Sequence, residues 1–494
     1  MLWLALRLPR LPLEAQPSRP PPSAIVSCER IVVADEAAAS AGVQPGMRLA
    51  AAWALLPELA VRERAAAAEQ AALLRLACWA GAFTSEVCLR PQALLLEVAA
   101  SLRLFGGAVS LFDAIRAGCV EQGFSPQVAL APTPLAAEWL AAAGDDRPCL
   151  VPAELPQRLG VLPLSALGLP AADLFRLSGF GARTLGDVLR LPRAGLARRL
   201  GAAFAADLAR ALDELPDPRA RFVFPERFAE RIELPARVDS APALGFAGRR
   251  LIGALCGWLA ARCAGVGECV FELQHERGAN ERPPTRIVLG FSGATRDPER
   301  IGRVLLERLQ RLELPAAVES IGLCADAPEP LGGREGSLFG RAAGGAADPS
   351  SLAALVERLQ ARLGRESVYA LACVAEHRPE NASQPVPPTL TPVRGTGARG
   401  NVRSGVSAPP GGPRPVCLLP LPQALFEAGG RPQRGGPLQL LAGPERIESG
   451  WWDAAEPSAA GDVRRDYFVA LSPSAEWLWI FRCEAGWFLH GFFA

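Results

Sequence analysis

Leu2-Trp3-Leu4-Ala5-Leu6-Arg7-Leu8 opens the chain as an apolar run that ends at Pro9. The run is too short for the hydrophobic region of a signal peptide, has no cleavage site after it and contains Arg7. It therefore predicts a buried first β-strand. No acidic residue occurs in this strand, and the first Asp of the whole chain is Asp35. A later apolar strand, 93–98, holds the single acid Glu97 and no adjacent acidic pair.

Strands and helices alternate downstream of this first strand. Further strands are expected at 31–33, 94–98 and 128–130, and the Pro-rich stretch 14–30 is expected to be a loop. Helices are expected at 48–56, 65–80, 108–122 and 134–143. The order is βαββαβ-like, which predicts a split α/β sandwich for a first domain at 1–149.

A helical region at 150–220 follows and contains a hairpin motif. Leu177-Ser178-Gly179-Phe180-Gly181-Ala182-Arg183-Thr184 has the Gly-hydrophobic-Gly pattern of a helix-hairpin-helix. Its glycines let backbone N–H groups face outward at a helix start, where they can bind a phosphate without reading sequence. Gly179, Phe180, Gly181 and Thr184 are therefore candidate contacts to a nucleic-acid backbone. A plain helical corner with a glycine cap is the alternative.

A second βαββαβ unit is predicted at 221–328, where arginines make the sequence locally basic. Residues 329–378 combine a Gly-rich loop with a helix, and 379–415 have the composition of a flexible linker. The last region, 416–494, is dense in aromatic residues, and the alternation at 467–471 and 477–482 predicts a small antiparallel sheet.

Composition excludes several classes of protein. With 494 residues and 50% hydrophobic content, the chain should form several folded domains of roughly 100–200 residues each. All 52 basic residues are Arg, and the net charge of +1 neither requires nor excludes a polyanion. The 12 Cys form no CxxC pair and the 3 His are far apart, so no zinc site and no cofactor are expected. No long uncharged apolar run predicts a membrane span, and we expect a cytoplasmic protein.

The segments together resemble the Y-family (UmuC/DinB-like) translesion DNA polymerases. Residues 31–61 resemble their palm–fingers junction, 177–192 their thumb, and the second βαββαβ unit stands where their little finger stands. Further motifs resemble the polymerase-like subunit of a bacterial mutagenesis cassette. These are SLRLFGG at 101–107, HRPENA at 377–382, GPERIESGWWD at 443–453 and WFLHGFFA at 487–494. The resemblance implies an α+β multidomain fold with palm, fingers, helix-hairpin-helix thumb, little finger and a small C-terminal β-rich domain.

The residues that carry polymerase chemistry in that family are missing here. Active members place an Asp on the first strand, at Ala5 or Leu6 of this chain, and an Asp-Glu pair at Gln92-Ala93. Their triphosphate-gripping Tyr and Arg correspond to Asp35 and Ala38, and their palm Lys to Pro134. Two-metal phosphoryl transfer needs carboxylates on neighbouring strands. The resemblance therefore implies no catalytic residues and no metal, with Glu14 and Glu97 as the only plausible remnants of a metal site.

A non-catalytic adaptor in SOS-induced mutagenesis is what this pattern implies. Its expected partners are primer–template DNA bound without sequence preference, the β sliding clamp, a RecA-like protein and an active error-prone replicative-type polymerase. The clamp peptide is expected at Glu335-Gly336-Ser337-Leu338-Phe339, with Glu335, Ser337, Leu338 and Phe339 as contacts. A rival clamp peptide is Gln423-Ala424-Leu425-Phe426. The aromatic region 416–494 is expected to dock a protein partner, although a plain small core would also explain its rings.

Two other classes of function stay open. One is an active translesion polymerase with non-standard metal ligands. The other is an unrelated helix-hairpin-helix repair protein, such as a nuclease or glycosylase, which would need a catalytic Asp or Lys near the hairpin. The chain has no Lys, and Asp187 lies inside the helix that follows the hairpin. The adaptor is therefore the preferred hypothesis.

Overall fold

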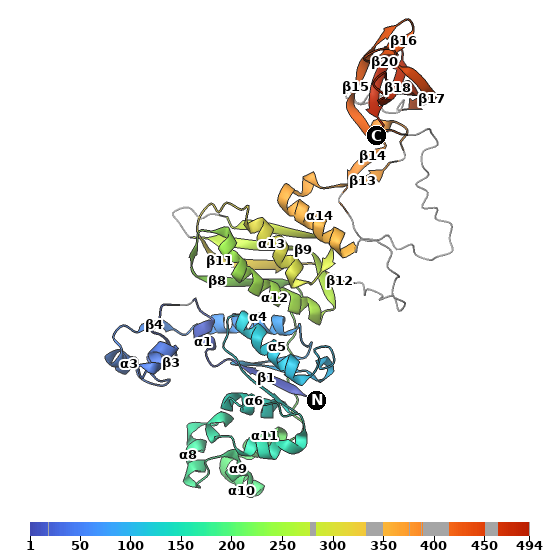
Figure 1. The fold of residues 1–494 in the computed structure, drawn as a ribbon. Coiled ribbons are helices and arrows are strands. Elements are labelled where there is room, and N and C mark those ends of the chain that lie inside the picture. The colour runs from blue at the N-terminus through green and yellow to red at the C-terminus, as the bar shows by residue number, and fades with distance from the viewer. Residues whose placement is uncertain are drawn as a thin grey trace. The chain divides into compact units, whose positions relative to one another are not determined.

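The computed structural model describes residues 1–17, 19–276, 283–331, 349–374, 376–386, 388, 414–449 and 463–493. The chain divides into two compact units, Met1–Arg362 and Leu363–Ala494. Figure 1 shows the elements of both. No helix within the described ranges is both long and apolar enough to cross a membrane.

The first domain of unit 1 is built on a four-stranded antiparallel sheet. The strand order is β5-β6-β1-β7, and the element order is the predicted βαββαβ. The strands are β1 (Trp3–Arg7), β5 (Val87–Arg90), β6 (Ala93–Glu97) and β7 (Gln127–Ala131). The helices are α4 (Ala66–Ala80), α5 (Ala108–Glu121) and α6 (Pro134–Ala143).

Alternation along β1 assigns its side chains to two different cores. Leu4 and Leu6 belong to the large core shared with α4 and α5, whereas Trp3 and Ala5 belong to the core shared with α6 and the helical region after it. Successive side chains of a strand point to opposite faces, so Ala5 and Leu6 cannot serve the same site. This alternation selects Ala5 as the residue on the α6 face.

A small subdomain is inserted between β1 and α4. Its sheet has the order β3-β2-β4, with β2 and β4 parallel. Its elements are α1 (Leu11–Glu14), β2 (Ser23–Ser27), β3 (Arg30–Ala34), α2 (Glu36–Ser40), α3 (Leu49–Leu55) and β4 (Ala60–Glu63). The prediction of a loop across 14–30 was wrong, because Ala24, Ile25 and Val26 form a buried strand directly after the prolines.

Residues 150–215 are helical, as predicted. The 3₁₀ turns are Pro152–Glu154 and Leu164–Leu167. The helices are α7 (Leu155–Gly160), α8 (Ala171–Gly179), α9 (Leu185–Leu189), α10 (Arg193–Leu200) and α11 (Ala202–Ala211). Their apolar sides share a core with α6, which attaches this helical domain to the first sheet (Figure 1).

The second βαββαβ unit has a different strand order, β10-β9-β11-β8, and β12 extends the β11 side of β9. Helices α12 and α13 cover one face of this sheet (Figure 1). The elements are β8 (Phe228–Val238), α12 (Gly245–Ala261), β9 (Ala264–His275), β10 (Thr285–Thr295), α13 (Pro298–Leu309), β11 (Val318–Ala325) and β12 (Pro328–Pro330).

Helix α14 (Pro349–Leu363) is held to this second sheet by one buried carboxylate. Glu357 accepts hydrogen bonds from the backbone N–H and the hydroxyl of Ser292, each at 2.8 Å, and pairs with Arg300. The Arg300 guanidinium and these donors hold the pKa of Glu357 below its usual value, although burial opposes them. A carboxylate paired in this way ties the helix to β10 and α13.

The two βαββαβ domains meet where α4 crosses α12. A Cβ on Gly257 would lie 2.3 Å from the carbonyl oxygens of Cys78 and Trp79, and one on Gly81 would lie 2.4 Å from the Gly257 carbonyl oxygen. Only glycine allows backbones to approach this closely. The crossing merges both domains into one continuous hydrophobic core.

Unit 2 is an all-β body apart from short turns in its described part. Strands β13 (Ala370–Cys373) and β14 (Ser383–Val386) form a hairpin, so ordered structure continues into the predicted linker 379–415. The six-stranded antiparallel sheet has the order β16-β15-β20-β19-β18-β17. Its strands are β15 (Cys417–Ala428), β16 (Arg431–Gln433), β17 (Gln439–Ser449), β18 (Val463–Leu471), β19 (Trp477–Cys483) and β20 (Gly486–Phe492).

Both strands that the sequence predicted in this last region lie within β18 and β19. Most of the described aromatic rings of this region are packed in hydrophobic clusters on the two faces of the sheet and are not exposed to solvent. Tyr467 stacks on Trp479 with ring centroids 4.1 Å apart, and its hydroxyl lies 2.8 Å from His490 Nδ1. Burial raises the pKa of Tyr467 to about 12 and lowers that of His490.

Candidate functional site

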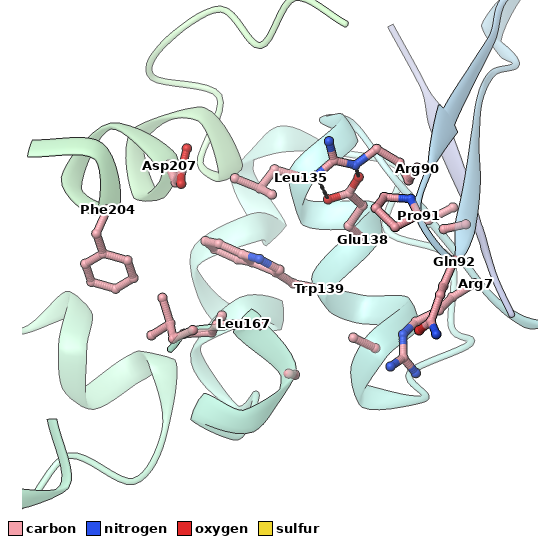
Figure 2. Close-up of a pocket in the computed structure, with 16 residues that line it drawn as sticks. Arg7, Arg90, Pro91, Gln92, Leu135, Glu138, Trp139, Leu167, Phe204 and Asp207 are labelled. Atoms are coloured by element: carbon pink, nitrogen blue, oxygen red, sulfur yellow. Dashed lines mark hydrogen bonds and ion pairs between the residues drawn. The ribbon is translucent and has the colours of Figure 1, made fainter. Parts of the chain in front are cut away.

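A cavity of about 420 Å³ lies where the first sheet meets the helical domain. We call it the palm pocket. Its walls come from β1, the β5–β6 turn, helix α6, the turn at 166–169 and helix α11. Figure 2 shows the sheet residues on one side, Trp139 in the middle, and Phe204 and Asp207 on the opposite side. Of the positions that the family resemblance assigns to metal ligands, Ala5, Gln92 and Ala93 line the palm pocket, and Leu6 does not.

The sheet side of the palm pocket carries Ala5, Arg7, Gln92 and Ala93. Ala5 is fully buried, and Arg7 lies opposite Ala93 in the register of β1 and β6. Arg7 Nη1 donates to Gln127 Oε1 at 2.6 Å. The structure thus brings together Ala5 and Gln92-Ala93, which the sequence placed 87 residues apart, and no carboxylate stands at these positions.

The helix side supplies two carboxylates, and both have arginine partners. Glu138 lies 2.6 Å from Arg90 Nε and 3.9 Å from Arg219 Nη1, as Figure 2 shows for Arg90. Burial raises the pKa of Glu138, and the two arginines counteract it only in part. Asp207 accepts from Arg210 Nη1 at 2.8 Å. These carboxylates neutralise arginines of the protein.

Neither suspected remnant of a metal site reaches the palm pocket. Glu97 stands at the far end of β6, opposite Trp3, and its Oε1 accepts from the backbone N–H of Leu2 and Ala99. The Glu14 carboxylate accepts from the backbone N–H of Ser125. Among the residues that the structure describes, no three His, Cys, Asp or Glu side chains are grouped as metal ligands.

Asp35 and Thr133 both have structural roles as helix caps. Asp35 accepts from Ala38 N at 2.8 Å and from the backbone and hydroxyl of Ser23 at 2.6 and 2.8 Å. Thr133 caps α6, and Pro134 occupies the first turn of that helix, where a proline costs no hydrogen bond. The local sequence here serves helix initiation, and it lacks the cation or phenol that grips a triphosphate.

The predicted hairpin is present between α8 and α9. Gly181 has φ +78°, a backbone conformation that favours glycine, and Thr184 caps α9 in a capping box with Asp187. The hairpin N–H groups already have acceptors, however. Gly181 N donates to Ser178 O, and Arg183 N and Thr184 N donate to Asp187 Oδ2. A phosphate bound here would have to displace the Asp187 carboxylate or use side chains.

Arginine side chains are the better donors at this hairpin. The Arg199 guanidinium lies over the half-exposed ring of Phe180 at 4.6 Å from its centroid. The cation–π contact leaves the guanidinium edge facing outward from the ring. The motif that predicted a phosphate site made of backbone N–H groups therefore forms a surface with a basic and an aromatic side chain, and its Asp187 caps α9. Asp187, the acid next to the hairpin, serves in this structure as part of the α9 capping box.

Of the two candidate clamp peptides, only the rival peptide lies within the described residues. Glu335, Ser337, Leu338 and Phe339 lie outside the described residues. The rival peptide lies inside β15, where Gln423, Ala424 and Leu425 pair with Leu489, Phe488 and Trp487 of β20. Leu425 packs against one core of unit 2, while Phe426 is 74% exposed. To insert both side chains into a pocket, this peptide would have to leave its pairing with β20.

Sequence reasoning missed Arg7, Arg90, Glu138, Trp139 and Asp207 as pocket residues. Arg7 could have been found, because strand periodicity places it on the same face as Ala5. The other four depend on how α6, α11 and the β5–β6 turn meet. Such contacts between segments distant in the sequence leave no local pattern.

Comparison with known proteins agrees with the architecture. Residues 15–142 match the impB/mucB/samB family. Two curated relatives, both named Protein ImuB, come from Caulobacter vibrioides strains NA1000 / CB15N and ATCC 19089 / CB 15. Each is 29% identical over 476 residues, which cover 92% of this chain and 100% of the relative.

Two solved structures match a large part of the chain with low similarity. An insertion ternary complex of Dbh DNA polymerase is 16% identical, with a TM-score of 0.40, and covers 66% of this chain and 98% of its own. DinB from Sulfolobus solfataricus is 15% identical, with a TM-score of 0.39, and covers 67% of this chain and 100% of its own. Residues 15–142 thus match the model of the impB/mucB/samB family, and the chain is similar to Protein ImuB over 92% of its length.

Proposed function

We propose that this protein is a non-catalytic, polymerase-like adaptor in SOS-induced translesion mutagenesis. It binds primer–template DNA and the β sliding clamp, and it recruits an active error-prone replicative-type polymerase together with a RecA-like partner of the ImuA type. The observation that carries the proposal is the palm pocket. Its sheet wall presents Ala5, Gln92 and Ala93 where a polymerase needs carboxylates, and its two carboxylates pair with arginines.

Primer extension is the direct test of the non-catalytic part. The full chain is incubated with primer–template and all four deoxynucleotides, with Mg²⁺ or Mn²⁺. We expect no extension, because ions bridging nucleotide and primer need free carboxylates. The matched control is the Glu138→Gln/Asp207→Asn variant. Extension by the wild type that this variant loses would contradict the proposal.

The second candidate function is an active polymerase with unusual metal ligands. Primer extension by the wild type that the Glu138→Gln/Asp207→Asn variant loses would support it. The observation in its favour is that Glu138 and Asp207 both line the palm pocket. Their ion pairs with Arg90 and Arg210 argue against it, because a metal would have to displace a guanidinium from each. Glu97→Ala serves as a negative control, since Glu97 bonds to backbone away from the pocket.

DNA binding through the helical domain is expected to be electrostatic. Arg199 over Phe180 offers a guanidinium beside an exposed ring, a pair suited to a phosphate and a stacked sugar or base. Arg199→Ala should weaken binding of primer–template by about threefold and reduce its salt dependence. Arg210→Ala, whose guanidinium pairs with Asp207, is the control. Equal losses in both variants would assign the effect to net charge alone.

Clamp binding is tested by pull-down with purified β clamp. Leu338→Ala/Phe339→Ala should abolish retention if those side chains fill the clamp's apolar pocket. Phe426→Ala is the control, because Phe426 is exposed on the rival peptide and sits in a paired strand. Undiminished retention of the Leu338/Phe339 variant would refute the assignment. Loss of clamp retention in the Phe426→Ala variant alone would assign the clamp peptide to residues 423–426.

Unit 2 is the proposed docking module for a protein partner. Its described surface exposes Trp477, Leu421 and Phe426 at 52%, 80% and 74%. A deletion should remove 363–494 rather than 416–494, because Arg465 of β18 bonds to Glu380 and a cut at 415 would divide the unit. We expect the remaining 1–362 to keep DNA binding and to lose the polymerase partner. Retained recruitment would refute this role.

A further inference from the structure

A second cavity in unit 1, of about 550 Å³, is lined by several arginines. We call it the arginine pocket. It lies between the end of α1, the inserted β-sheet, helix α4, strand β8 and helix α12. Five arginines and three carboxylates line it, namely Arg19, Arg62, Arg75, Arg231, Arg250, Glu14, Asp35 and Glu233. It is separate from the palm pocket and shares no lining residue with it.

Arg75 is the central feature of the arginine pocket. Its residue is only 7% exposed on helix α4, and its Nε is buried without a hydrogen-bond partner. No ion pair joins its guanidinium to a described carboxylate. Burial lowers the pKa of Arg75, and the charge of Glu230 opposes this. A buried cation in a protein interior normally has a hydrogen-bonded anion beside it, so this one lacks its expected partner.

Arg250 of helix α12 adds a second cation to the same wall. Its Nε is also buried without a partner. Burial, followed by the positive charge of Arg75, lowers the pKa of Arg250 to about 10. The guanidinium carbon lies 5.9 Å from the Phe124 ring centroid, at the outer limit of a cation–π contact. Two arginines that repel each other thus line one cavity.

The nearby carboxylates do not neutralise this pair. Glu14 is bonded to the backbone N–H of Ser125, and Asp35 caps helix α2. Glu233 is exposed. Glu230 attracts Arg75 but forms no ion pair with it in the described structure, and burial raises the pKa of Glu230 to about 7. The acidic groups around the pocket therefore leave the positive charges of Arg75 and Arg250 without a neutralising anion.

The two helices that carry the arginines are closely packed against each other. Helices α4 and α12 touch backbone to backbone at Gly81 and Gly257, as described above. Arg75 and Arg250 come from these two helices, so they cannot move apart without breaking that crossing. Fixed guanidiniums with free N–H groups are the donors that bind phosphate oxygens best, because their planar fork matches the oxygen spacing.

We propose that the arginine pocket binds a phosphate group, carried by a nucleotide or nucleic acid or free in solution, between Arg75 and Arg250. The proposal does not rest on the adaptor role, because the observation behind it is the buried, unpartnered arginines of this pocket.

The test titrates the full chain with inorganic phosphate, pyrophosphate, dATP and a 5′-phosphorylated oligonucleotide, using sodium chloride at matched ionic strength as reference. Binding is followed by calorimetry and by the melting temperature. We expect saturable binding by the wild type. Arg75→Met and Arg250→Gln should each weaken it at least tenfold, whereas Arg249→Gln, an exposed neighbour on the same helix, should not change it.

Comparison of the four anions identifies the source of the phosphate. Equal affinity for phosphate and dATP indicates a site for the phosphate alone, and a tenfold preference for dATP or for the oligonucleotide indicates contacts to the rest of that ligand. Without phosphate, Arg75→Met should melt no lower than the wild type, because it removes a repelling charge and keeps volume. No saturable binding beyond the chloride reference would overturn the proposal. Equal weakening in Arg249→Gln, or a lower melting temperature of Arg75→Met without phosphate, would also overturn it.

Discussion

The palm pocket and the arginine pocket differ in whether their charged side chains have ion-pair partners within the protein. In the palm pocket, Glu138 and Asp207 pair with Arg90 and Arg210, and Arg7 donates to Gln127. In the arginine pocket, Arg75 and Arg250 have buried Nε atoms with no hydrogen-bond partner and no ion pair to a described carboxylate. Glu138 Oε1 of the palm pocket also has no hydrogen bond, but it lies 2.6 Å from Arg90 Nε. The number of charged residues in a cavity therefore says little about its ligand. What matters is whether each buried charge is already satisfied by the protein.

The largest expected effect comes from returning a carboxylate to the palm pocket. Ala5→Asp places an acid at a fully buried position, and a buried carboxylate without a dedicated partner costs about 3–5 kcal/mol. Urea denaturation of residues 1–362 measures the loss. Gln92→Glu, at the half-buried turn of the same wall, is the control and should cost less than about 1 kcal/mol. A stable Ala5→Asp variant would show that Arg7 or Arg90 is free to pair, and the pocket would not be self-neutralised.

The helix crossing beside the arginine pocket gives the next largest effect. Gly257→Ala would push a Cβ to 2.3 Å from two backbone carbonyl oxygens, which cannot move aside cheaply. Overpacking of this kind costs about 3 kcal/mol, and the shift of α12 should also weaken phosphate binding. Gly253→Ala, on the same helix, would place a Cβ 2.7 Å from Gln122 Nε2, at the end of a side chain, and 3.6 Å from Trp79 Cδ1, and should cost less. Equal stability of both variants would argue against close packing of the two helices.

A pH dependence is expected from Glu230. Its folded pKa of about 7 lies above its ordinary value, so the folded state keeps a proton that the unfolded state releases. Stability should therefore fall as pH rises from about 4.5 to 7 and stay level above that. Glu230→Gln should remove this slope and stabilise the protein by about 3 kcal/mol at pH 8, with little effect at pH 4.5. An unchanged slope in denaturation curves across this range would show that Glu230 is solvated.

The smallest effect is expected at the exposed edge of the palm pocket. Asp207 and Arg210 form an i,i+3 pair with side chains 46% and 37% exposed, and exposed pairs of this kind contribute about 0–0.5 kcal/mol. Asp207→Asn should leave stability within that range and create no phosphate site, because Arg210 stays solvated. Phosphate titration of this variant checks the second point. Saturable binding would show that a single freed arginine suffices, which would weaken the contrast between the two pockets.

Much of the architecture could be predicted from local sequence. Both βαββαβ units, the helical region and the strands around Tyr467 and Trp477 follow from hydrophobic periodicity and from glycine and proline positions. Strand β2 was missed because three apolar residues after a proline run give too short a pattern. The strand orders of the two βαββαβ units differ, β5-β6-β1-β7 against β10-β9-β11-β8. Element order alone does not specify which strands pair.

The hairpin shows where a correct motif led to an incomplete site. Gly181 forms the predicted hairpin turn and Thr184 caps α9, yet Asp187 accepts from N–H groups that the motif was expected to offer to a phosphate. Asp187 was visible in the sequence only as a residue three positions after Thr184. The same spacing that makes a capping box satisfies the donors, and local spacing cannot show whether a ligand competes for them.

The sequence by itself determined which residues are absent from the first strand and the later strand, because an acid that is not encoded cannot be supplied by folding. It also determined the alternation that puts Ala5 and Arg7 on one face. Only the tertiary structure decided that Ala5 meets Gln92 and Ala93 in one pocket, that Glu138 and Asp207 face it already paired, and that Arg75 and Arg250 share another pocket unpaired. Burial and charge pairing depend on contacts between segments far apart in the chain, so no local pattern encodes them.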